Sequence, residues 1–112
     1  MDPEPTEDEQ FHLNILRGVR TKVHQMVNYQ AIVSPVSRFY PDNPFHPCIT
    51  IVPRPTIRRR QFPVVTIILR GDRLVVWAGG VERAEVEISR EDFIENLAAV
   101  LASFGYSPRP TK

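Results

Sequence analysis

The stretch Val64–Ala78 constrains the fold more than any other part of the chain. It reads VVTIILRGDRLVVWA, so apolar side chains flank a central Gly71-Asp72 pair on both sides. A glycine in the first position of a two-residue loop is typical of a type II′ turn, whose twist matches that of the strands it joins. The sequence therefore predicts an antiparallel β-hairpin with its tip at this pair.

The two-residue loop also determines which residues of the hairpin lie opposite one another. One face carries the cross-strand pairs Leu69–Leu74, Ile67–Val76 and Val65–Ala78, and the other carries Ile68–Val75 and Thr66–Trp77. A hairpin with one face in water alternates apolar and polar residues, whereas this one is apolar on both faces. We therefore expect both faces to be covered. Either one helix packs on each face, or both helices pack on one face and a second copy of the protein covers the other.

Amphipathic helices are predicted at both ends of the chain. Over about residues 7–28, apolar side chains recur every four residues, which is the spacing of one helical face. These side chains are Phe11, Ile15, Val19, Val23 and Val27. A second helix is expected to start with Ser89 as its N-cap and to stop at Gly105. Its inner face comprises Phe93, Ile94, Leu97, Val100, Leu101 and Phe104.

Three further segments predict strands. Residues 30–39 contain Pro35, which lacks an N–H group and restricts this strand to a sheet edge or a bulge. Cys48–Val52 is a short strand, and residues 83–88 alternate between charged and apolar side chains. We predict an α+β fold, namely an antiparallel sheet of four or five strands with an N-terminal and a C-terminal amphipathic helix. The chain forms a single domain over residues 1–112, with mobile tails at about 1–5 and 106–112.

The composition is that of a soluble protein. Of the 112 residues, 42% are hydrophobic and 24% are charged, as in ordinary globular domains. The single cysteine, Cys48, excludes an internal disulfide, and no signal peptide is recognisable. The longest apolar run, Phe62–Leu69, is too short to cross a bilayer. We therefore expect a cytoplasmic protein that does not contact membranes.

The sequence contains no arrangement typical of catalysis or metal binding. His46 and Cys48 form the one metal-like pair, with Asp42 nearby, whereas a zinc site needs three or four convergent ligands. No serine lies in a nucleophile elbow, and no glycine-rich loop has the spacing that binds phosphate. We expect no enzymatic activity, no cofactor and no metal.

Three consecutive arginines, Arg58, Arg59 and Arg60, lie just ahead of the apolar hairpin. Charges beside a hydrophobic strand oppose edge-to-edge aggregation, so solubilisation is one explanation. The other explanation is a loop that contacts phosphates, in which Arg54 joins the three arginines and Phe62 stacks on a base.

The end of the chain, a strand followed by the motif VEISREDF at residues 86–93 and a helix, resembles that of Whirly-type single-strand binders. The resemblance covers about the last third of the chain, and it implies a nucleic-acid partner. A helix ahead of the sheet departs from the element order of that family.

Two functions are therefore compatible with the sequence. The first is a small non-enzymatic binding or regulatory protein that acts through protein–protein contacts and forms a homo-oligomer. Its interface is the second face of the hairpin, formed by Thr66, Ile68, Val75 and Trp77. The alternative is a nucleic-acid-binding module that uses the arginines at positions 54 and 58–60.

Overall fold

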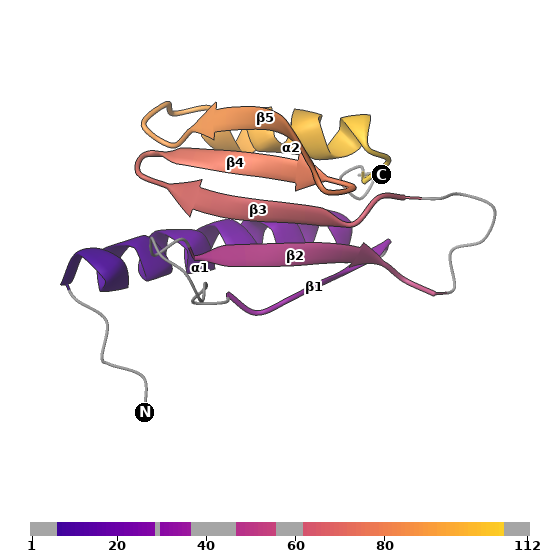
Figure 1. Cartoon of the computed structure of the whole chain (residues 1–112), viewed down its shortest axis with the longest axis horizontal. Coiled ribbons are helices and arrows are strands. Elements are labelled where there is room, and N and C mark those ends of the chain that lie inside the picture. Colours follow the sequence, from indigo (N-terminus) through magenta and orange to yellow (C-terminus); the bar gives the residue numbers. More distant parts are fainter. Residues whose placement is uncertain (1–6, 29, 37–46, 56–61, 107–112) are drawn as a thin grey trace.

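The computed structural model describes residues 7–28, 30–36, 47–55 and 62–106. The elements are α1 (Glu7–Val27), β1 (Ala31–Val33), β2 (Cys48–Pro53), β3 (Val65–Arg70), β4 (Arg73–Ala78), β5 (Val81–Glu87) and α2 (Phe93–Ser103). The strands form one antiparallel sheet in the order β1-β2-β3-β4-β5. Both helices lie on the same face of this sheet (Figure 1). The predicted α+β fold is confirmed.

The central hairpin has the predicted register, because its two-residue loop leaves no freedom in the pairing. All five expected pairs are present, from Leu69–Leu74 at the tip to Val65–Ala78 at the base. Gly71 has φ 65°, the positive value that the first position of such a loop requires. The next turn, Gly79-Gly80, has φ 62° and 82°, and positive values at both positions define a type I′ turn.

The core lies between the helices and one face of the sheet. The sheet contributes one side of the hairpin, including the fully buried Ile67, Leu74 and Val76. Each helix contributes one stripe of buried apolar side chains. These are Leu16, Val19, Val23 and Val27 of α1, and Leu97 and Leu101 of α2. Burial of apolar area at about 25 cal/mol per Å² makes this single layer the main source of stability.

Phe11 departs from the predicted core, because its side chain is 63% exposed. A helix of 21 residues is about 30 Å long, whereas strands of six residues span about 20 Å. The first turns of α1 therefore project beyond the sheet, as Figure 1 shows. The buried stripe that packs on the sheet begins at Leu16.

The start of α2 also differs from the prediction. Ser89 lies in a turn, and the helix begins at Phe93 with Asp92 in the N-cap position. The Asp92 carboxylate accepts a hydrogen bond from Arg90 Nε at 3.1 Å and makes no side-chain bond to the helix backbone. This bond from Arg90 lowers the pKa of the Asp92 carboxyl below its ordinary value. Short turns thus connect β5 to α2 at the point where Ser89 was expected to cap the helix.

Gly105 ends α2 as predicted, with φ 103°. Its N–H donates to Ala102 O, and the N–H of Tyr106 donates to Leu101 O, both at 3.0 Å. This pair of bonds is a Schellman motif. Tyr106 was assigned to the C-terminal tail, but its side chain is fully buried and its hydroxyl donates to Pro63 O at 2.8 Å. The core therefore reaches one residue into the predicted tail.

The first strand is shorter than predicted because Arg20 and Ser34 end it. Arg20 Nε donates to Ser34 O and Arg20 Nη2 to Val33 O, each at 3.0 Å. The Ser34 hydroxyl, and not its carbonyl, accepts the Thr50 N–H at 2.8 Å. The strand lies at the sheet edge, as Pro35 requires. Residues 37–39 of the predicted strand fall outside the described residues.

Candidate interaction surface

The second face of the sheet is the candidate functional site, and we call it the open face. It consists of the side chains that alternate with the core residues along the strands: Ile32, Cys48, Thr50, Val52, Val64, Thr66, Ile68, Val75 and Trp77. Among the described residues, no helix or strand lies over this face (Figure 1). An antiparallel sheet can leave one face in water, but such a face is normally polar, and this one is not.

The structure places all four predicted interface residues together at the centre of the open face. Thr66 pairs with Trp77, and the adjacent pair is Ile68 with Val75. Val75 is buried, whereas the other three are half-buried. At the margins, Ile32 and Val64 are 47% and 48% exposed. The exposed large apolar side chains of this face therefore lie at its margins, while its centre is largely buried within the single chain.

Trp77 brings an unsatisfied donor to the open face. Its indole Nε1 is buried, and no acceptor for it is found within the described part of the chain. A buried donor without a partner costs about 1–3 kcal/mol. Buried tryptophans normally hydrogen-bond, and they are enriched at interfaces because one side chain offers both apolar area and a donor. This residue is also the one tryptophan of the protein.

The margin of the open face at β5 is acidic. In the cross-strand register Glu82, Glu85 and Glu87 lie opposite Trp77, Val75 and Arg73 on this face. Arg73 Nη1 contacts Glu85 at 2.8 Å, Arg73 Nη2 contacts Glu87 at 3.5 Å, and the bond to Glu85 raises the pKa of the Arg73 guanidinium. These groups are about half exposed, so the pairs add little stability.

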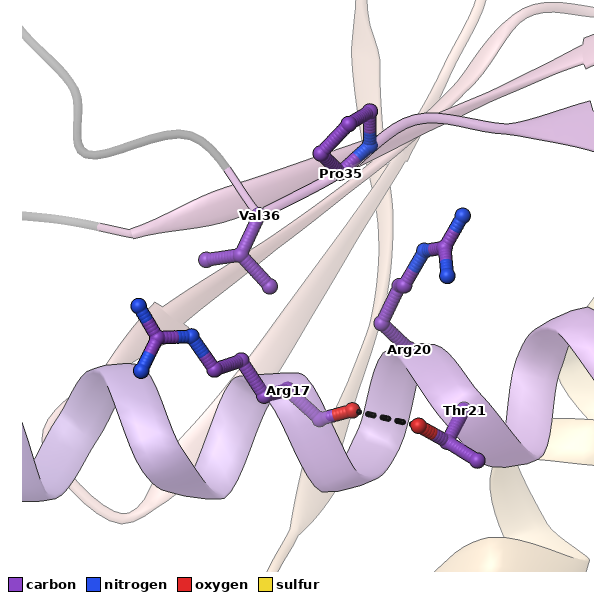
Figure 2. A pocket seen from close by; sticks show the side chains of 5 residues that line it. All are labelled: Arg17, Arg20, Thr21, Pro35 and Val36. Carbon is purple, nitrogen blue, oxygen red and sulfur yellow. Dashed lines mark hydrogen bonds between the residues drawn. The ribbon is translucent and has the colours of Figure 1, made fainter.

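Two arginines of α1 lie on the helix side of the sheet, near the edge formed by β1. A hollow of about 400 Å³ between α1 and the chain after β1 is lined by Arg17, Arg20, Thr21, Pro35 and Val36 (Figure 2). The two carbonyl bonds of Arg20 hold its guanidinium at the sheet edge. Within the described ranges neither arginine pairs with a carboxylate, although Arg17 Nη1 contacts the Asn14 side-chain oxygen. The sequence analysis did not single out Arg17 and Arg20, because only the folded chain brings α1 beside the chain that follows β1.

The residues predicted to contact nucleic acid are only partly described. Arg54 is half-buried, and its Nε donates to Asn28 O at 2.7 Å. Phe62 packs against the core, with its ring centroid 5.1 Å from that of Tyr106. Arg58, Arg59 and Arg60 lie outside the described residues. The structure therefore does not bring these five residues into one described site.

Comparisons with known proteins add no further information. No protein-family model, curated protein or solved structure matches the chain. In the part of the chain that the structure describes, no cluster of three or more His, Cys, Asp or Glu side chains is suited to hold a metal ion. Neither described helix has the length and apolar character needed to span a membrane.

Proposed function

We propose that the protein is a non-enzymatic binding protein that self-associates through its open face. The observation that carries this proposal is an apolar sheet face with both helices on the opposite side. Of the two arrangements that the sequence leaves open, this is the one in which a second copy supplies the missing cover. The same contact would exclude water from Ile32 and Val64, which are half exposed in the single chain.

The size of the face sets the expected strength of the contact. Five strands about 4.8 Å apart and about 20 Å long present roughly 500 Å² per copy, or roughly 1,000 Å² for two copies. This value lies at the lower limit for a specific interface. We therefore expect a dimer with a dissociation constant in the micromolar range, of the kind used in reversible regulatory assembly.

Sedimentation of a charge variant tests the proposal. Thr66→Lys places a cation at the centre of the open face, where its neighbours Trp77 and Ile68 offer no counter-charge. Desolvating an unpaired charge costs several kcal/mol, so the dimer should weaken by at least about 100-fold. Ala99→Lys is the matched control, because Ala99 is exposed on α2, behind the sheet.

The expected result is a dimer at tens of micromolar for the wild type and for Ala99→Lys, and a folded monomer for Thr66→Lys. Circular dichroism verifies that the fold of each variant is retained. Trp77 fluorescence gives a second measure, because its emission should move to shorter wavelength as the wild type associates. A wild type that sediments as a monomer at 100 micromolar, a concentration well above the expected micromolar constant, would refute the proposal.

The alternative, nucleic-acid binding through Arg54 and the arginines at positions 58–60, stays a prediction. Charge reversal of Arg58, Arg59 and Arg60 should abolish a salt-sensitive gel shift if these residues contact phosphates. The absence of any shift of the wild type at low salt would remove this alternative.

A further inference from the structure

The hollow between α1 and the chain after β1 is lined by two cations that lack a carboxylate partner. Arg17 and Arg20 are three residues apart, so they lie on neighbouring turns of α1 and on the same side of it (Figure 2). Among the described residues, neither guanidinium group contacts a carboxylate. Like charges at this spacing destabilise a helix. The pair therefore lacks the counter-charge that would offset its repulsion.

Acidic residues are absent from the sequence around this hollow. Residues 10–41 contain four Arg or Lys and no Asp or Glu. Glu9, the last of the acids at the start of α1, precedes Arg17 by eight residues, which is about 12 Å along the helix axis. This separation exceeds the screening length of about 8 Å at physiological ionic strength. The acids of β5 lie at the opposite edge of the sheet (Figure 1). The hollow is therefore a local site of positive charge.

Arg20 is held in position before any ligand binds. Its Nε and Nη2 donate to the carbonyl groups of Ser34 and Val33, each at 3.0 Å. An arginine has five N–H groups, so three of them remain for a ligand. Because this guanidinium group is already fixed, a ligand that binds it loses less side-chain entropy. Arg17 is exposed and makes one contact, from Nη1 to Asn14 Oδ1 at 3.2 Å, so its side chain can turn toward the hollow.

We infer that this hollow binds a small molecule that carries two or more phosphate groups. The guanidinium groups of Arg17 and Arg20 lie on either side of Val36 (Figure 2), so a ligand with two joined phosphates contacts both, whereas a single phosphate contacts one. Planar guanidinium groups form paired hydrogen bonds with phosphate oxygens. The apolar side chains of Pro35 and Val36 limit the access of water, which strengthens these bonds. The volume of about 400 Å³ lies within the range of small-molecule sites, about 300–1,000 Å³.

Calorimetric titration with inorganic pyrophosphate tests the site. We expect a dissociation constant in the sub-millimolar range at low ionic strength, and binding at least about tenfold weaker in about 0.5 M NaCl, because salt screens the partly exposed charges. Inorganic phosphate should bind at least about tenfold more weakly than pyrophosphate, since it contacts one guanidinium group instead of two. No binding of pyrophosphate at low salt, or equal affinities for the two probes, would overturn the inference.

Matched charge variants locate the binding on α1. Arg17→Gln removes one cation from the hollow and should weaken pyrophosphate binding by at least about tenfold. Lys22→Gln is the control, because it removes an exposed cation of the same helix that does not line the hollow, and it should change the affinity by less than about twofold. Equal weakening by both substitutions would indicate a general attraction to the helix and overturn the site. Arg20 also holds the end of β1, so the exposed Arg17 is the safer residue to replace.

Two further measurements separate this site from the other proposals. The hollow lies on the helix side of the sheet, so Thr66→Lys, which weakens the proposed dimer, should bind pyrophosphate with the affinity of the wild type. Loss of binding in Thr66→Lys would overturn the placement of the site within a single chain. A short single-stranded oligonucleotide should not displace pyrophosphate, because its phosphates are singly charged diesters. Displacement would assign the hollow to nucleic acid and overturn the small-molecule ligand.

Discussion

Substitution by alanine at Gly105 and at Gly18 should change the free energy of unfolding in opposite directions. Gly105 ends α2 with φ 103°, and a Cβ there would collide with Cδ1 and Cε1 of the Phe62 ring. That ring packs on Tyr106, whose hydroxyl is bonded to Pro63 O. Gly18 is exposed on α1, and nothing lies within 4 Å of the position that a new Cβ would occupy.

The magnitude follows from these two environments. In Gly105→Ala, the left-handed backbone costs about 1–2 kcal/mol, and displacement of the Phe62 ring adds about 1–3 kcal/mol. The free energy of unfolding should therefore fall by about 2–5 kcal/mol. Gly18→Ala should raise it by about 1 kcal/mol, the difference in helix propensity. At about 4–6 °C per kcal/mol for a domain of this size, Tm falls by at least about 10 °C in the first variant and rises by about 5 °C in the second.

Urea denaturation followed by circular dichroism measures both changes. The variants are compared in the Thr66→Lys background, because association would otherwise make the apparent stability depend on protein concentration. A Gly105→Ala variant within about 0.5 kcal/mol of its parent would refute the conclusion that Phe62, Gly105 and Tyr106 form one packed unit. A destabilised Gly18→Ala would contradict the open surroundings of that position.

Two further predictions concern buried titratable groups. Burial raises the pKa of Tyr106 from its ordinary value near 10 to about 12. The unfolded chain therefore loses this proton first, so stability should be complete below about pH 10 and fall by roughly 2–3 kcal/mol as the pH rises to 12. Urea midpoints at pH 8 and pH 11 test this, and Tyr106→Phe should show a smaller alkaline loss; an equal loss would assign it to other groups. Burial also raises the pKa of the Cys48 thiol, and this residue is 6% exposed. A thiol reagent at pH 8 should therefore label the native protein at least about tenfold more slowly than the urea-unfolded chain. Equal labelling rates would contradict its burial.

The proposed dimer would be weak and reversible, which agrees with the way the open face is built. Its centre is apolar and partly buried already, so association removes only a moderate area from water. At its margin beside β5, Arg73 pairs with Glu85 and Glu87, and salt screens such exposed pairs. The edge at β1 is poorly suited to strand addition, because β1 has three residues and Arg20 occupies its outward carbonyl at Val33.

The sequence by itself determined the hairpin, the restriction that Pro35 places on the first strand and the approximate place of both helices. A two-residue loop such as Gly71-Asp72 sets the pairing of its flanking strands, and a proline such as Pro35 restricts a strand to an edge. These are local rules that need no knowledge of distant contacts. The four residues of the predicted interface followed from the same register, and the structure places them side by side.

Only the tertiary structure decided which face the helices cover. Both faces of the hairpin are apolar, so periodicity could not choose between them. A contact between distant residues also brought Tyr106 into the core, where its hydroxyl donates to Pro63 O. Sequence patterns show which residues share a face, but the packing of the whole chain decides what that face meets.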